Sequence, residues 1–264
     1  MDVNRRGFLS GVGVLAGGAL GGSVQPLQPA SEGVPSWLPA QDPAVVKETV
    51  GVSHGNLKRV RELVERQPAL SNAAYDWGFG DWETALGAAS HTGRREIAEL
   101  LIANGAHPSL FSAAMLGQLD VVKALVAASP GIQRTLGPHG INLLAHARTG
   151  GPGAAEVVKY LESIGGADRQ LPTERLETAD RDAVVGEYVF GAGPRDYFAV
   201  DVQEDRLGIE RPGQTRRFLL HTGNLVFFPS GVPSVRIAFA RSSAGAAQLT
   251  IADPDVFLTA KRRA

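Results

Sequence analysis

Histidine is the side chain best suited to acid–base or metal chemistry near neutral pH. The 264-residue chain has six of them: His54, His91, His107, His139, His146 and His221. His54 and His91 come one and two residues before a glycine that is expected to end a helix, where polar residues are ordinary. A metal site would need histidines and carboxylates at ligand spacing, and no such spacing occurs along the chain. We therefore expect no metal site and no cofactor.

The sequence gives no clear signal for nucleophilic or metal-assisted catalysis. It contains no Ser-x-x-Lys or His-Glu-x-x-His motif, and its one Gly-x-Ser-x-Gly match, at 51–55 (GVSHG), lies at the end of an expected helix and not at the strand-to-helix turn that this motif requires. It also contains no cysteine, which excludes disulfides, thiolate metal sites and a cysteine nucleophile. The formal net charge of -1 is not that of a nucleic-acid-binding protein. The sequence accordingly predicts no catalytic residues, no nucleic-acid partner and a protein that is not an enzyme.

The first thirty residues, 1–30, have the anatomy of an export signal, with a charged start, an apolar middle and small residues at the end. The apolar stretch is too short to cross a bilayer, which takes about 20 residues. Arg5, Arg6, Phe8 and Leu9 match the pattern of a twin-arginine signal, which this segment resembles. The resemblance implies a periplasmic or secreted protein with no stable membrane anchor once the signal is removed.

Four similar segments follow a Pro-rich linker, residues 31–42. Each has a helix of small residues, a glycine, and a second helix with apolar residues at helical spacing. Leucines of the second helices recur at Leu63, Leu100, Leu125 and Leu161, with an average spacing of about 33 residues. No single segment can bury its apolar face alone, so the four are expected to stack as a solenoid.

This pattern resembles the ankyrin repeat, over residues 43–170 and about four units. The match is strongest over residues 84–89 (TALGAA), at Gly93, and over residues 100–106 (LLIANGA). Ala85 and Gly87 replace the proline and histidine of the family pattern. The histidine hydrogen bonds that join repeats in the family are therefore expected to be mostly missing. The resemblance implies an α-helical solenoid that binds another protein.

Two long tips, residues 72–83 and 130–141, connect these segments. The first tip carries four aromatic residues: Tyr75, Trp77, Phe79 and Trp82. Exposed aromatic residues on a loop are typical of protein-contact hot spots, but the rings could instead fold back and form a local core. His139 lies between a proline and a glycine in the second tip, where it is either a turn residue or an extension of the same contact surface.

From residue 183 the apolar pattern alternates with a period of two, after a charged connector, residues 171–182. Strands are expected near 184–190, 196–203, 206–211, 215–220, 224–228, 234–240, 247–252 and 256–261. Short strands separated by Gly and Pro turns predict an antiparallel meander that closes as a small barrel. Residues 186–188 and 235–239 resemble small lipocalin-like β-domains that are appended to exported bacterial hydrolase-type proteins, a resemblance that implies no particular chemistry.

The sequence thus predicts an α+β protein with an ankyrin-repeat domain at 43–170 and an antiparallel β-domain at 183–264. The expected function is non-catalytic binding of an unknown periplasmic protein by the helical stack, with the 72–83 tip as part of the surface. Two alternatives stay open. The β-domain could bind a small apolar ligand, or a hydrolase site could lie in a polar pocket at the domain junction.

Overall fold

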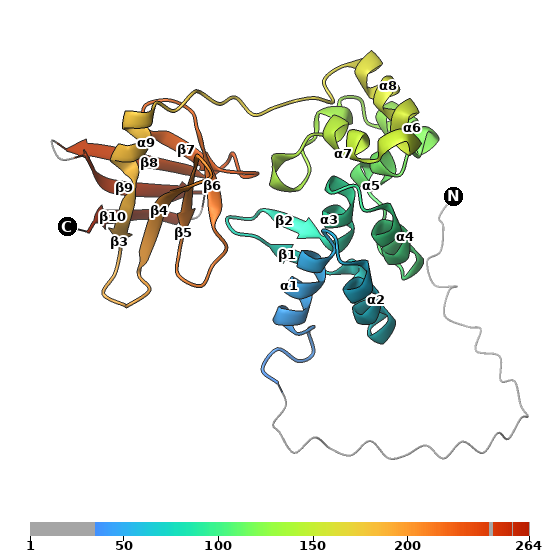
Figure 1. The fold of residues 1–264 in the computed structure, drawn as a ribbon, viewed down its shortest axis with the longest axis horizontal. Coiled ribbons are helices and arrows are strands. Elements are labelled where there is room, and N and C mark those ends of the chain that lie inside the picture. Colours follow the sequence, from blue (N-terminus) through green and yellow to red (C-terminus); the bar gives the residue numbers. More distant parts are fainter. Residues whose placement is uncertain (1–34, 243–244, 255, 264) are drawn as a thin grey trace, which may run out of the picture. The chain divides into compact units, whose positions relative to one another are not determined.

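The computed structural model describes residues 35–242, 245–254 and 256–263 (Figure 1). The predicted signal, with Arg5, Arg6, Phe8 and Leu9, lies outside the described residues and stays a prediction. Residues Pro39–Ala264 form one compact unit. Within the described residues, no helix is both long and apolar enough to cross a membrane. The protein is of the mixed class that the sequence predicts, with helices first and a closed antiparallel sheet second.

Four pairs of helices make up the described chain between residues 43 and 164 (Figure 1). They are α1 (Pro43–Val52) with α2 (Leu57–Arg66), α3 (Ala85–His91) with α4 (Arg95–Ala103), α5 (Leu110–Met115) with α6 (Leu119–Ala128), and α7 (Leu143–Thr149) with α8 (Ala155–Ile164). The first helices contact one another in the order α1, α3, α5, α7, while α2 contacts α4 and α6 contacts α8. Residues at the same place in neighbouring pairs are therefore brought close together.

Small residues and helix caps explain why these short segments become closely packed helices. The side chains of Thr84 and Asn142 accept hydrogen bonds from the first-turn amides of α3 and α7, at 2.9 and 2.8 Å, which is the role of an N-cap. Ala88 and Ala114 are fully buried where the first helices meet. Gly117 has a φ of 75° and lies against the carbonyl of Gly153, a position that only a residue without Cβ can occupy.

The 72–83 tip forms a short antiparallel hairpin of β1 (Ala74–Asp76) and β2 (Trp82–Thr84), in which Tyr75 pairs with Glu83. Successive side chains of a strand point to opposite faces. In β2 this alternation exposes Trp82 and buries Glu83. The 130–141 tip contains two 3₁₀ turns, η2 (Ile132–Arg134) and η3 (Pro138–Gly140). Of two further turns, η1 (Pro68–Asn72) leads from α2 to β1, and η4 (Gly151–Ala154) leads from α7 to α8.

The described C-terminal part is a closed eight-stranded antiparallel barrel, which confirms the predicted meander (Figure 1). Its strands are β3 (Gly186–Val189), β4 (Tyr197–Gln203), β5 (Arg206–Glu210), β6 (Arg217–His221), β7 (Val226–Pro229), β8 (Arg236–Ser242), β9 (Gly245–Asp253) and β10 (Val256–Arg262). Each strand pairs with its neighbour in sequence, and β10 closes the barrel on β3. Helix α9 (Thr178–Val184) begins inside the predicted connector and contacts β9.

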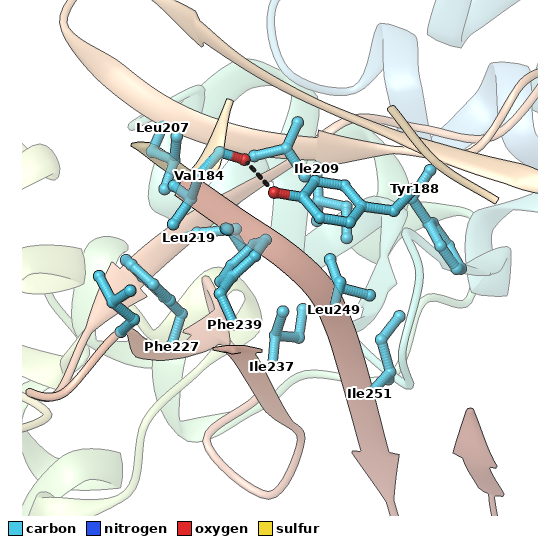
Figure 2. Close-up of a cluster of buried hydrophobic side chains, with 14 of the residues drawn as sticks. Val184, Tyr188, Leu207, Ile209, Leu219, Phe227, Ile237, Phe239, Leu249 and Ile251 are labelled. Carbon is cyan, nitrogen blue, oxygen red and sulfur yellow. Dashed lines mark hydrogen bonds between the residues drawn. The ribbon is translucent and has the colours of Figure 1, made fainter. Parts of the chain in front are cut away.

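Large apolar side chains pack together inside the barrel (Figure 2). The ring of Phe239 lies 5.4 Å from that of Tyr188 and 5.6 Å from that of Phe227, centroid to centroid. The hydroxyl of the fully buried Tyr188 donates a 2.8 Å hydrogen bond to the carbonyl of Val184. These aromatic residues are part of the hydrophobic core of the barrel.

Candidate metal centre

Three histidines and one glutamate meet among the helix pairs: His54, Glu83, His91 and His139. His54 lies in the turn after α1, and His91 is the last residue of α3. Glu83 is the central residue of β2, and His139 is the central residue of η3. One ligand atom from each of these residues lies within 4.8 Å of the other three. We call this group the His/Glu cluster.

Several ligand atoms of the cluster lie about as far apart as the ligands of a single metal ion. Nε2 of His91 lies 3.2 Å from Nε2 of His54 and 2.8 Å from Oε1 of Glu83. Nε2 of His54 lies 3.4 Å from Oε2 of Glu83, and Nε2 of His139 lies 3.4 Å from Oε1. A tetrahedron with metal–ligand bonds of about 2.0–2.1 Å has edges of about 3.3–3.4 Å. Three of these four separations are close to that edge, with Oε1 of Glu83 nearest to His91 and His139 and Oε2 nearest to His54.

Glu83 is the most deeply buried residue of the cluster, with a side chain that is 0% exposed. Its Oε2 accepts a 2.8 Å hydrogen bond from Nε1 of Trp77. Its Oε1 receives no well-aligned hydrogen bond from any described residue, although His91 and His139 are close to it. Burial raises the pKa of Glu83, but the imidazoles of His139 and His91 outweigh burial and bring the pKa to about 2. The cluster thus contains a fixed buried negative charge.

The Nδ1 atoms of two of these histidines lie next to hydrogen-bond acceptors. Nδ1 of His54 lies 3.0 Å from the carbonyl oxygen of Gly51, and Nδ1 of His139 lies 2.7 Å from Oδ2 of Asp81. Because a carbonyl or carboxylate oxygen accepts, each Nδ1 carries the proton and donates it. Nε2 is then the nitrogen available as a ligand, the arrangement by which proteins orient metal-binding histidines.

Asp81 links the cluster to the barrel. Its Oδ1 accepts a 2.9 Å hydrogen bond from the backbone amide of His139, and its Oδ2 forms an ion pair with Arg217 of β6. Burial raises the pKa of Asp81, but His139 and Arg217 outweigh it and lower the pKa. For His139, burial lowers the pKa, yet Asp81 and Glu83 outweigh it and raise the pKa to about 9. A cation is therefore favoured at this place, either a proton or a metal ion.

His146 of α7 lies beside the cluster without belonging to it. Its ring centroid is 6.4 Å from that of His91 and 4.7 Å from that of Phe111. Its Nδ1 lies 3.0 Å from the carbonyl of Asn142. Burial is the main cause that lowers the pKa of His146 to about 4. This side chain is therefore a neutral neighbour that adds no positive charge to the cluster at neutral pH.

The five residues predicted to form a protein-contact surface lie in different environments. Trp82 is 63% exposed, whereas Trp77 is half-buried and holds Glu83 through its ring nitrogen. Tyr75 packs against Trp77 at 5.0 Å between centroids. Phe79 packs against the core of the barrel, and His139 enters the His/Glu cluster. The five side chains therefore do not form one surface patch.

A search for ligand spacing along the chain misses His54, Glu83 and His91, because the ligands come from separate segments. One signal in the sequence does point to His54 and His91. His54 and His91 both stand just before the glycine that follows the first helix of their pair. Equivalent positions in stacked helix pairs are neighbours in space, so two histidines there predict an adjacent pair of imidazoles.

Neither the protein-family models nor the curated proteins contain a match to this chain. The function is therefore argued from the geometry of the His/Glu cluster.

Proposed function

We propose that this protein binds one divalent transition-metal ion of the zinc class at the His/Glu cluster. The ligands are the Nε2 atoms of the three histidines and the carboxylate of Glu83. The single observation that carries the proposal is the convergence of these four ligand atoms within 4.8 Å around a buried carboxylate. Imidazole-rich sites suit Zn²⁺, Co²⁺, Fe²⁺ or Ni²⁺, whereas Ca²⁺ and Mg²⁺ prefer sites made of oxygen ligands.

The surroundings of the cluster support a metal centre over a simple hydrogen-bonded network. Metal-binding histidines commonly donate their second N–H to a carbonyl or carboxylate, and ligating carboxylates are themselves hydrogen-bonded. Here His54 donates to the carbonyl of Gly51, and His139 donates to Asp81. The carboxylate of Glu83 accepts from Trp77. A divalent ion would also bind Oε1 of Glu83, which accepts no well-aligned hydrogen bond from the described residues.

The helix pairs are the scaffold in this proposal. We take the four pairs of residues 43–170 to be ankyrin-type repeats in a protein exported by the twin-arginine pathway, as the sequence resemblance implies. Stacking of such repeats supplies His54 and His91 from equivalent positions, and the tips between repeats supply Glu83 and His139. The same exported protein would then carry a metal ion outside the cytoplasm.

Metal titration of the purified protein tests the proposal. The protein is freed of metal with a chelator, and Zn²⁺ binding is measured by isothermal titration calorimetry. We expect one equivalent to bind, and Glu83→Gln or His91→Asn to weaken the affinity more than about 100-fold, beyond the usual effect of an outer-shell change. The matched controls are the exposed residues Glu156 and His107, as Glu156→Gln and His107→Asn. No stoichiometric binding, or equal binding by all variants, would refute the proposal.

Protein binding by the helical part is a second candidate function, and the exposure of Trp82 favours it. Its indole is 63% exposed on β2, on the strand face opposite to Glu83. If Trp82 is a hot spot for a periplasmic partner, Trp82→Ala should cost at least about 2 kcal/mol of binding. Affinity capture from periplasmic extract with wild type and Trp82→Ala in parallel tests this. Because the side chain of Trp82 lies on the strand face opposite to Glu83, the variant should bind Zn²⁺ normally.

A further inference from the structure

A cavity of about 460 Å³ opens beside the His/Glu cluster, in the compact unit that contains both the helix pairs and the barrel. Two of the proposed metal ligands, His54 and His139, line it together with Trp77. Arg206 of β5, Arg216 just before β6, and Arg217 of β6 also line it. A metal ion in the cluster would therefore lie next to a space large enough for a small molecule.

The exposure of the ligands shows which side of the cluster is open. The side chain of Glu83 is 0% exposed and that of His91 is 11% exposed. The side chains of His139 and His54 are 25% and 32% exposed, and these are the two that line the cavity. The two more exposed ligands thus face the cavity, and a further ligand can approach the centre from that side.

The charge around the cavity favours an anion. Its described lining residues include three arginines and two histidines but no aspartate or glutamate. Arg217 is engaged by Asp81 and by the carbonyl of Ser230. Arg216 lies 2.8 Å from Oδ1 of Asp201. Both of these arginines are therefore partly neutralised.

Arg206 is differently placed. No carboxylate of the described residues lies within 4.0 Å of its guanidinium, which instead stacks over the ring of Phe218 at 3.4 Å from the centroid. A guanidinium in this position can form two parallel hydrogen bonds to a carboxylate or phosphate group. Zinc-class centres can expand from four ligands to five, and Arg206 lines the same cavity as two of the proposed metal ligands, His54 and His139.

We propose that a small oxyanion, a carboxylate or phosphate group, binds in this cavity as an external ligand of the metal ion, with Arg206 as its counter-charge. This inference rests on the proposed metal site. It goes beyond that site by naming the chemical class of a second ligand. The metal ion and Arg206 both contribute to binding, so neither alone is expected to hold the oxyanion tightly.

Cobalt substitution tests the inference, because the visible absorption of bound Co²⁺ reports its coordination. The full chain is loaded with Co²⁺ and titrated with inorganic phosphate and, in a second arm, with acetate, against chloride at equal ionic strength. We expect a saturable one-to-one spectral change with phosphate or acetate but not with chloride. Arg206→Gln should raise the dissociation constant at least tenfold. Arg148 is also an exposed arginine but does not line the cavity, so the control Arg148→Gln should leave the constant unchanged.

The outcomes separate the two proposals. If Co²⁺ binds but its spectrum does not respond to phosphate or acetate, the oxyanion site is refuted and the metal site stands. An equal response by wild type and Arg206→Gln also refutes the role of Arg206 and with it the site described here. If Co²⁺ itself does not bind, both proposals fail. Circular dichroism of each variant verifies that the barrel is folded.

Discussion

The Nε2 atoms of His54 and His91 lie 3.2 Å apart, although 37 positions separate the two residues in the chain. The first helices of successive pairs are in contact, and each histidine stands at the end of its own first helix. Stacking of helix pairs therefore brings two of the proposed ligands together. A site of this kind exists only while the pairs are stacked, so metal binding and the stability of the helical part should be coupled.

Zinc should raise the melting temperature of the protein. A ligand that binds only the folded state at 100 times its dissociation constant adds about 2.7 kcal/mol to stability. For a chain of this size that corresponds to a shift of about 5–10 °C. Thermal melts followed by circular dichroism, with Zn²⁺ and with excess chelator, measure the effect. The shift should vanish in Glu83→Gln and persist in Glu156→Gln, and equal shifts in both variants would contradict the coupling.

Asp81→Asn should weaken Zn²⁺ binding by about 10–100-fold, the usual effect of losing an outer-shell carboxylate. The carboxylate fixes Nδ1–H of His139 at 2.7 Å and makes its imidazole a stronger ligand. The same change leaves the buried Arg217 without its counter-charge, which should destabilise the fold by about 3–5 kcal/mol. Calorimetric titration and urea unfolding measure the two effects separately.

Arg217→Met is the control for Asp81→Asn. It breaks the same ion pair but leaves the hydrogen bond between Asp81 and His139 in place. We expect it to lower stability with at most a small change in Zn²⁺ affinity. If Arg217→Met weakens Zn²⁺ binding as much as Asp81→Asn does, then Asp81 acts through the ion pair and not through His139.

The barrel and the helix pairs could be predicted because their signals are local. The apolar period of two and the Gly and Pro turns locate the eight strands, and β4 (Tyr197–Gln203) is found at its predicted place near 196–203. Leu63 and Leu161, two of the repeated leucines, are buried as expected. These features depend on neighbours in sequence, so periodicity is enough to find them.

The cluster could not be found in the same way, because it depends on contacts between segments. Glu83 lies in a tip whose aromatic residues favour a contact surface. Only the pleat of β2 shows that the side chain of Glu83 points inward while that of Trp82 points outward. His139 has a φ of 59° in η3, a backbone turn that periodicity does not predict. Its approach to Asp81 joins residues 58 positions apart.

Gly117→Ala should destabilise the helical part by about 3 kcal/mol. At its φ of 75° an L-residue costs about 1–2 kcal/mol, and the added Cβ would overlap the carbonyl of Gly153 in the neighbouring pair. Gly105→Ala is the matched control, since its φ of 93° is also left-handed but no atom lies within 4 Å of the added Cβ. Urea unfolding of both variants isolates the cost of the close approach. Equal destabilisation would show that the backbone contact is unimportant.

The stability of the barrel should fall between about pH 10 and 12 because of Tyr188. Burial raises the pKa of its hydroxyl to about 12, from 10.0 in an unfolded chain. As the pH rises, the unfolded state therefore loses this proton before the folded state does. The contribution of the buried phenol to stability is complete below pH 10 and disappears as the pH rises toward 12. Two pKa units correspond to about 3 kcal/mol. Tyr188→Phe removes this dependence, together with a hydrogen bond to Val184 that is worth about 1 kcal/mol.

Urea unfolding of wild type and Tyr188→Phe from pH 8 to 11.5 measures this effect. At pH 8 the wild type should be the more stable protein by about 1 kcal/mol, the contribution of the hydrogen bond. The difference should shrink above pH 10 and then reverse, because only the wild type must keep a buried phenol protonated against the rising pH. Tyr160→Phe, in α8 and outside the barrel, controls for general effects of alkaline pH. A difference that stays constant over this range would mean that Tyr188 ionises as easily in the barrel as in the unfolded chain.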